Sequence, residues 1–298
     1  MAQTMLIHHA ANRRHGRPAG SESAVRACLD AAARVVEIDI TPLADGAFVL
    51  LHDERLEDAT DGQGIVAQVT AEQARGIHYR QGGTVTDEPI GFLDQVIPLI
   101  TAAPDLVELQ LDLKEHSLLT DKALADLLRL LQPVKERVRI TSGADWAIRR
   151  LRGLDPGLPL GFDPLLYVEI GCGEEETDPT QPPFRVGAYG YADDHPLASR
   201  VWGASADYLA ARAEALWAQA PVEMWYIRAA LLARALDDGF DWIAYLHARG
   251  AAVAAWTLDP DQPHHVHLAR LLLERGVDRI TTNDAPGLAA MLGGGVVF

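Results

Sequence analysis

Positive charge is scarce in this chain, and that scarcity narrows the choice of partners. Lysine and arginine total 26 of the 298 residues against 42 aspartates and glutamates, so the formal net charge is −16. Such a surface repels polyphosphates and anionic lipid headgroups, because neither can release counterions against it. We therefore expect no nucleic-acid partner. A phosphate-bearing small molecule would need local positive charge inside its site, most simply from a bound cation.

Cysteines and long apolar runs are scarce as well. The two cysteines, Cys28 and Cys172, are too few for a disulfide framework and fit a reducing compartment. The sequence nowhere runs for roughly 18 uninterrupted apolar residues, and its start, Met1 to His9, has no basic segment followed by a long apolar one. We expect a cytoplasmic protein without stable membrane insertion. The oligomeric state is left open.

Short β-type runs alternate with amphipathic helical stretches over most of the chain, which favours parallel βα units. One α/β barrel takes about 250 residues around a single core, so the length does not require two domains. We predict an α/β fold, a single (β/α)₈ TIM barrel spanning residues 1–298. The expected strands are Thr4–His8, Val35–Thr41, Leu106–Leu113, Arg137–Thr141, Leu158–Phe162, Val222–Ile227, Ala251–Thr257 and Val277–Thr281.

Helical patterns fill the spaces between these strands, and two long stretches interrupt the alternation. Residues 52–104 follow the second strand and predict a small inserted subdomain, whereas residues 165–203 are rich in Gly, Pro and acidic residues and predict a lid or a surface loop. The acidic triplet at 174–176 is interpreted as solvated surface. The main helical patterns are Ser21–Ala33, Leu118–Leu131, Ala206–Ala218, Phe240–Arg249 and His264–Arg275, with Ser21 as a cap and Gly250 and Gly276 as stops.

Carboxylates alternate with apolar residues in two of the predicted strands. In Val36–Ile40 the period of two places Glu37 and Asp39 on one strand face, which in a barrel is the interior, and Asp112 ends a similar row in the third strand. Carboxylates inside a core are costly unless they are paired or metal-bound. These three are candidate ligands of a hard divalent cation such as Mg²⁺ or Ca²⁺. The structural alternative is a buried ion pair with Lys114 and no metal.

Histidines fall at the same end of the predicted barrel. The first strand ends with His8 and His9. The Asp-Gly dipeptide at 45–46 is a strong two-residue hairpin signal, and such a turn places positions summing to about 91 opposite each other, so His52 would face Asp39. One of the two N-terminal histidines and His52 could act as general acid and base, because the imidazole pKa lies nearest neutral pH.

Together these segments resemble the glycerophosphodiester phosphodiesterase family, a TIM-barrel family of the phospholipase C-like phosphodiesterases. Leu6–Ala10 resembles its His-Arg-Gly start, and Glu37-Ile38-Asp39 resembles its Glu-x-Asp motif. The resemblance runs from the first strand to the last. The other matching segments are Asp45-Gly46, His52-Asp53, Asp112-Leu113-Lys114, Ser142, Trp256-Thr257 and the closing run from Gly276 to Pro286.

The resemblance implies metal-dependent hydrolysis of a small-molecule glycerophosphodiester, such as glycerophosphocholine or glycerophosphoethanolamine, to glycerol 3-phosphate and an alcohol. It also implies that residues 52–104 form the family's inserted subdomain beside the active-site mouth. The implied site has His8 and His52 as the acid/base pair, Glu37, Asp39 and Asp112 as metal ligands, and His9, Lys114 and Trp256 as substrate-binding residues, Trp256 walling the glycerol pocket.

Departures from the family pattern concern phosphate binding. His9 stands where the family has an arginine, and an imidazole is a weaker, pH-dependent anion contact, so Arg13 or Arg14 could take its place. Gly-Ser-Glu-Ser at 20–23 replaces Pro-Glu-Asn-Thr. Two rival functions therefore stay open: a divergent lyase that cleaves a phospholipid headgroup through a cyclic phosphate, and a silent barrel that binds a phosphorylated metabolite. The histidines at 264, 265 and 267 are interpreted as solvated residues of a surface helix.

Overall fold

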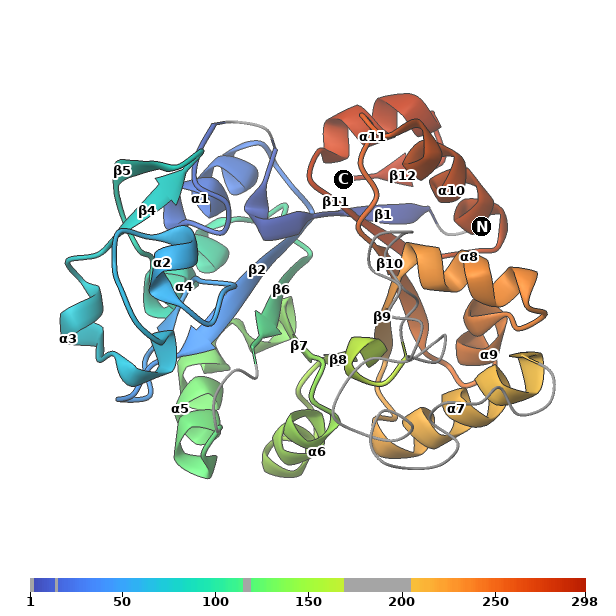
Figure 1. Cartoon of the computed structure of the whole chain (residues 1–298), viewed down its shortest axis with the longest axis horizontal. Helices are drawn as coiled ribbons and strands as arrows, with labels where there is room; N and C mark the ends of the chain where they lie inside the picture. The colour runs from blue at the N-terminus through green and yellow to red at the C-terminus, as the bar shows by residue number, and fades with distance from the viewer. Residues whose placement is uncertain (1–2, 14–15, 115–118, 169–204) are drawn as a thin grey trace.

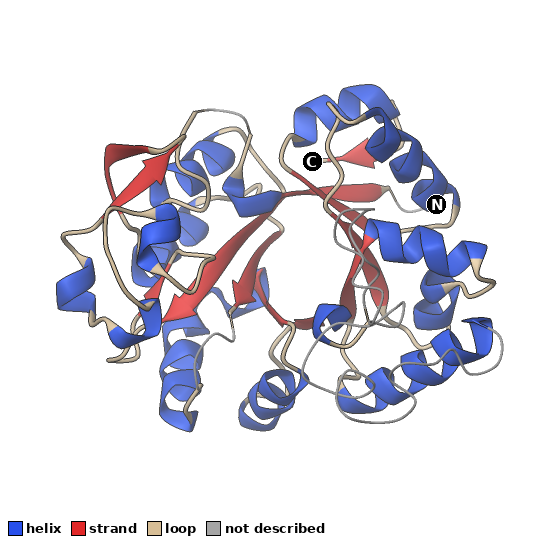
Figure 2. Ribbon diagram, viewed as in Figure 1, coloured by secondary structure: helices blue, strands red, loops and turns tan. Residues whose placement is uncertain are grey.

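A closed barrel of parallel strands forms the centre of the molecule, with helices around it (Figures 1 and 2). The computed structural model describes residues 3–13, 16–114, 119–168 and 205–298, and within them eight parallel strands close the barrel. The predicted TIM-barrel fold is confirmed. Strand β1 (Thr4–His8) closes the ring by pairing with β2 (Val35–Pro42) and β11 (Arg279–Thr282). The others are β6 (Glu108–Leu113), β7 (Val138–Ser142), β8 (Leu160–Phe162), β9 (Met224–Arg228) and β10 (Ala252–Trp256).

Side chains along each barrel strand alternate between two apolar environments. In β1, Leu6 belongs to the large core between strands and helices, whereas Ile7 packs inside the barrel near Val35 and Met224. Since neighbouring parallel strands pair residue by residue, the same alternation runs around the ring. Polar side chains on the same face of their strand as Ile7, Val35 or Met224 therefore point into the barrel.

The helices begin and end largely where the sequence signals stand. Ser21 caps α1 by accepting a hydrogen bond from the Ala24 N–H at 3.2 Å, and Gly250, just beyond α9, has a φ of +79° that favours glycine. All five predicted helical patterns are confirmed, and α4, α6, α8 and α11 add to them. The outer helices are α1 (Glu22–Asp30), α4 (Leu93–Ala102), α5 (Asp121–Leu131), α6 (Asp145–Leu154), α7 (Ser205–Gln219), α8 (Ala229–Asp237), α9 (Trp242–His247), α10 (Pro263–Glu274) and α11 (Ala285–Leu292).

The turn after β2 differs from the two-residue hairpin predicted at 45–46. Strand β3 (Phe48–Val49) pairs with β2 so that Thr41 opposes Val49, a register in which paired positions sum to 90. Leu43 and Ala47 close a three-residue loop in which Gly46 has a φ of +87°. Three-residue hairpin loops commonly end in such a left-handed glycine. The predicted pairing of His52 with Asp39 is therefore wrong.

A small hairpin layer follows β3 and lies beside the barrel (Figure 1). It contains α2 (Leu56–Ala59), α3 (Ala71–Ala74) and the antiparallel strands β4 (His78–Gln81) and β5 (Thr84–Pro89). Its buried apolar residues, drawn from positions 43–92, form a cluster separate from the main core, whereas α4 packs into the main core. The division of 52–104 as a subdomain stays a prediction.

Near the starts of three barrel strands, the inside of the barrel holds a buried ion network. Glu108, at the start of β6, is paired with Arg279 of β11 and with Arg139 of β7, whose Nη2 lies 3.0 Å from the Glu108 carboxylate.

Within the described residues no helix is long and apolar enough to cross a membrane. Arg14, Cys172, the acidic triplet and most of the 165–203 loop lie outside those residues.

Candidate active site

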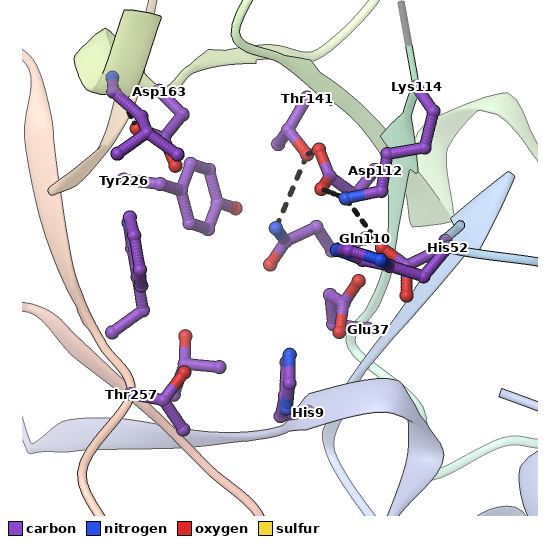
Figure 3. Close-up of a pocket in the computed structure, with 14 residues that line it drawn as sticks. His9, Glu37, His52, Gln110, Asp112, Lys114, Thr141, Asp163, Tyr226 and Thr257 are labelled. Atoms are coloured by element: carbon purple, nitrogen blue, oxygen red, sulfur yellow. Dashed lines mark hydrogen bonds and ion pairs between the residues drawn. The ribbon is translucent and has the colours of Figure 1, made fainter. Parts of the chain in front are cut away.

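A pocket of about 180 Å³ opens at the carboxyl ends of the barrel strands, where TIM-barrel enzymes carry their active sites (Figure 3). It brings together all the sequence-predicted site residues except His8. Side chains from β2, β6 and the segments after β1, β3 and β10 converge on it. The predicted residues that line it are His9, Glu37, Asp39, His52, Asp112, Lys114 and Trp256.

The three candidate metal ligands face each other across neighbouring strands. In the parallel pairing of β2 with β6, Asp39 lies opposite Asp112 and Glu37 opposite Gln110. One carboxylate oxygen from each of Glu37, Asp39 and Asp112 lies within 4.8 Å of the other two. Glu37 and Asp39 are buried, so the inward polar row predicted for these strands is confirmed as geometry.

Lys114 is in direct contact with two of these carboxylates. Its Nζ lies 2.8 Å from Asp39 Oδ1 and 2.6 Å from Asp112 Oδ2. Burial by itself lowers the pKa of Lys114, but Asp112 and then Asp39 more than offset this and raise it, so the ammonium is charged. Thr141 Oγ1 donates to the other oxygen of Asp112 at 3.0 Å and fixes its orientation.

The single ammonium group of Lys114 does not balance the three carboxyl groups of Glu37, Asp39 and Asp112. Burial, and then the charge of Asp39, raise the pKa of Glu37 from 4.5 to about 8, although the Ala10 N–H donates to Glu37 Oε2 at 2.7 Å. The raised pKa reflects the crowding of buried negative charge around Glu37. A closely spaced all-oxygen donor set with excess negative charge fits a hard divalent cation.

His9, and not His8, enters this pocket. His8 pairs with Val36 and shares its outward face; its fully buried ring lies 6.4 Å from that of Phe298, and its Nε2 lies 3.5 Å from the Arg13 guanidinium. His9 is the next residue, so the alternation of the strand turns it inward. The prediction that placed His8 in the site differs from the structure, because Ile7 faces the barrel interior and the alternation along the strand turns His8 outward.

The orientation of His9 depends on Asn283 and Asp259, which the sequence analysis did not single out. His9 Nδ1 lies 2.9 Å from Asn283 Oδ1, and Asn283 Nδ2 donates to Asp259 Oδ2 at 2.9 Å. Burial by itself lowers the pKa of His9, but Glu37 and then Asn283 raise it overall. With Nδ1–H donating to Asn283, Nε2 is the nitrogen left for the pocket (Figure 3).

His52 reaches the pocket from the segment after β3. Thr41 Oγ1 donates to the Leu51 carbonyl at 2.7 Å, which holds this segment against β2 without a strand pair. The His52 side chain is 63% exposed, and its Nδ1 lies 3.0 Å from Asp53 Oδ1. His52 is therefore a solvent-exposed imidazole at the mouth, whereas His9 is half-buried and held by its hydrogen bond to Asn283.

Further polar residues line the pocket beside the predicted site residues, among them Gln110, Thr141, Asp163 and Tyr226. Gln110 Nε2 donates to Thr141 Oγ1 at 3.3 Å, and Tyr226 extends from β9 across the pocket from Glu37 (Figure 3). Asp163 follows β8. Gln110 lies on the inward polar row predicted for β6, whereas Asp163 and Tyr226 belong to the β8 and β9 segments, whose sequences show no alternating polar row.

Comparisons with known proteins agree with this geometry. Residues 17–163 match the model of the glycerophosphoryl diester phosphodiesterase family. A glycerophosphodiester phosphodiesterase of Caldanaerobacter subterraneus subsp. tengcongensis is 28% identical over 193 residues, which cover 63% of this chain and 74% of that protein. The chain belongs to the glycerophosphodiester phosphodiesterase family. Among solved structures, an Oleispira antarctica phosphodiesterase in complex with the product sn-glycerol-3-phosphate has a TM-score of 0.66 at 18% identity, covering 97% of both chains.

A second solved relative supports the same barrel. The glycerophosphodiester phosphodiesterase of Parabacteroides distasonis has a TM-score of 0.66 at 16% identity and covers 97% of both chains. At such low sequence identities, the similarity to these two structures supports the fold alone. The part of this chain that matches the family, residues 17–163, includes Glu37, Asp39, His52, Asp112 and Lys114. His9 and Trp256 lie outside that range, so their place in the pocket rests on geometry.

Proposed function

We propose that this member of the family is a metal-dependent phosphodiesterase that hydrolyses glycerophosphodiesters to glycerol 3-phosphate and an alcohol. The observation that carries the proposal is the convergence of three carboxylates, one ammonium and two imidazoles on a single pocket at the catalytic end of the barrel. The sn-glycerol-3-phosphate bound in the Oleispira protein supports the proposal, since this compound is the expected product.

Glu37, Asp39 and Asp112 would hold the cation, which we expect to be Mg²⁺ or Ca²⁺ because all three ligands are carboxylates. When bound, the cation would neutralise and polarise phosphate oxygens. Lys114 supplies a fixed positive charge beside them and holds the phosphate in place. Trp256 bounds the pocket on the β10 side and would wall the glycerol moiety.

His9 and His52 are the proposed acid and base. They approach the pocket from different elements, His9 half-buried and His52 exposed, so one imidazole takes a proton from the attacking hydroxyl or water while the other donates a proton to the leaving alcohol. His9 thus replaces His8 in the role that the family resemblance implied. Placing His9 at the family's histidine puts Ala10 and Ala11 at its arginine and glycine. Their φ angles of +47° and +49° lie in the region that favours glycine.

The phosphate-binding arginine of the family then has no counterpart at position 10. Arg13 contacts His8 and does not line the pocket, and Arg14 lies outside the described residues. Phosphate binding would rest on Lys114, the cation and the imidazoles. Because Lys114 is the only lysine or arginine among the described residues that line the pocket, we expect the activity to depend strongly on the metal.

Release of glycerol 3-phosphate from a panel of glycerophosphodiesters tests the proposal. Turnover should require Mg²⁺, Ca²⁺ or Mn²⁺ and stop in EDTA. His9→Ala and His52→Ala should each lower kcat by roughly 10² to 10⁴, as expected for loss of a general acid or base. His8→Ala is the matched control, because it removes a neighbouring buried imidazole outside the pocket.

The outcomes separate the rival functions. A cyclic phosphate product from a phospholipid would indicate the lyase. No turnover of any diester, together with tight binding of a phosphorylated metabolite, would indicate the silent barrel. A loss of turnover per folded molecule in His8→Ala that equals the loss in His9→Ala would contradict the placement of His9 as the acting imidazole.

A further inference from the structure

A second cavity adjoins the catalytic pocket and is larger than it. Its volume is about 440 Å³, and it lies between the start of α8, the end of β10 and the start of α10. Trp256 and Thr257 line both cavities, so these two residues form a common wall between them. A molecule that extends from the catalytic pocket past Trp256 would enter this side cavity.

The size of the catalytic pocket argues that the side cavity belongs to the ligand site. Small-molecule sites usually enclose about 300–1,000 Å³, whereas the catalytic pocket alone encloses about 180 Å³. That is little room for both halves of a phosphodiester. The side cavity supplies the missing volume on the β10 side.

The polar lining of the side cavity is basic. Arg228 at the end of β9 and two histidines at the start of α10, His264 and His265, face it. The other described lining residues are the apolar or neutral residues of α8, β10 and α10, and no carboxylate is among them. In a chain of net charge −16, a cavity lined by arginine and imidazoles is a local exception that favours an anion.

His265 contributes a hydrogen-bond donor more than a charge. Its Nδ1 accepts the Asp259 N–H at 3.1 Å, so the proton of the neutral ring is on Nε2. Burial and then His264 lower the pKa of His265, whereas Asp259 and Asp261 act in the opposite direction. Arg228 therefore supplies the permanent charge. As the residue before α8, it also lies at the positive end of that helix dipole.

We infer that the side cavity binds an anionic group, a phosphate or a carboxylate, on the leaving alcohol of the diester. The inference rests on the proposed function and deepens it, because it names the class of alcohol that is released. Arg228 and His264 are then specificity-determining residues, and Trp256 separates the reacting phosphodiester from the second anion. Diesters with a cationic alcohol such as choline would be the poorer substrates.

A matched series of three diesters tests this inference. In each, glycerol 3-phosphate is esterified to glycerol, to glycerol phosphate or to glycerate. The glycerate diester differs from the neutral one mainly in charge, and the glycerol phosphate diester differs in charge and size. Wild-type kcat/KM should be about tenfold higher for at least one anionic diester than for the neutral one, as a charge-assisted hydrogen bond would produce. Arg228→Gln should remove that preference, His264→Gln should weaken it several-fold, and the neighbouring His267→Gln should not change it.

Equilibrium binding separates this inference from the proposed function. Calorimetry with Mg²⁺ in a His9→Ala background measures the same series without cleavage, and Arg228→Gln in that background should again abolish the tenfold preference. If the wild type cleaves none of the diesters but the binding preference holds, the proposed reaction fails and the anion site stands. Equal affinity for neutral and anionic diesters, or equal losses in Arg228→Gln and His267→Gln, would overturn the inference.

Discussion

His9 and Asn283 are joined by a hydrogen bond between residues at opposite ends of the chain. His9 Nδ1 lies 2.9 Å from Asn283 Oδ1, and the Asn283 N–H and side-chain amide both donate to Asp259. Because Asp259 accepts both donors of Asn283, the amide oxygen is turned toward His9. The network therefore selects the His9 tautomer whose Nε2 faces the pocket.

Removing this orienting amide should lower turnover without removing any group that touches the substrate. We expect Asn283→Ala to lower kcat by about 10- to 100-fold with little change in KM, because the imidazole remains but is no longer held in one tautomer and rotamer. The ¹⁵N chemical shifts of His9, followed with pH, should show both tautomers in the variant and one in the wild type. A changed kcat with unchanged His9 shifts would contradict the orienting role.

The sequence predicted the barrel and most of its pocket because both follow from periodicity. Alternation in β2 and β6 determines that Glu37, Asp39 and Asp112 share the interior, and no other packing leaves their apolar neighbours buried. The choice between His8 and His9 depends on which face of β1 turns inward. The sequence does not settle this, because Leu6 and Ile7 are both apolar; the structure places Ile7 inside the barrel and Leu6 in the core outside it.

Other parts of the site could not be read from the sequence. The contact of His9 with Asn283 joins the first strand to the segment after the last, and only closure of the barrel brings them together. The position of His52 depends on a three-residue turn and on Thr41 holding the Leu51 carbonyl. Turn length shifts register by one residue, and Asp-Gly occurs in hairpin loops of both lengths.

Glu108 should make the stability of the protein fall in acid. Burial by itself raises its pKa, but Arg279 and then Arg139 lower it below the ordinary value of 4.5. A depressed folded-state pKa contributes stability above the unfolded value, and that contribution is lost as pH falls through the folded value. The loss therefore begins near pH 4.5 and continues below it.

Urea unfolding at pH 7 and at pH 3 measures this contribution in Glu108→Gln. At pH 7 the variant should be about 3–5 kcal/mol less stable than the wild type, because Arg279 and Arg139 lose their buried counterion. At pH 3 the two proteins should differ less. Glu72→Gln on the exposed face of α3 is the control, and an equal difference at both pH values would show that the Glu108 charge is not the cause.

Lys114 and the proposed cation compete for the same carboxylates. Its Nζ lies within 2.8 Å of both Asp39 and Asp112, so its charge offsets part of the attraction for a cation. Lys114→Met should therefore bind Mg²⁺ or Ca²⁺ about tenfold more tightly while losing most of its turnover. Calorimetric titration of EDTA-treated protein measures the cation affinity, release of glycerol 3-phosphate measures the turnover, and exposed Lys122→Met is the control for both. Absence of cation binding in both the wild type and Lys114→Met would favour the buried ion pair without metal.

Ala10 offers a gain-of-function test of the histidine placement. If His9 takes the family's histidine position, an arginine at position 10 should reach the phosphate, and Ala10→Arg should lower KM for a glycerophosphodiester by about tenfold through charge-assisted hydrogen bonds while kcat is kept. Ala10 already has a φ of +47° with a Cβ, so the longer side chain adds little backbone strain. Its N–H to Glu37 is retained.

Ala10→Gln separates the charge of the new side chain from its length. The neutral amide can make one hydrogen bond but no bidentate charged pair, so it should improve KM at most twofold. Steady-state kinetics at two salt concentrations give a further check, because a gain from charge shrinks as ionic strength rises. An equal gain from both variants would mean that length alone matters. If Ala10→Arg lowered turnover while His9→Arg kept it, the result would indicate that His8 is the catalytic histidine and that position 9 binds the phosphate.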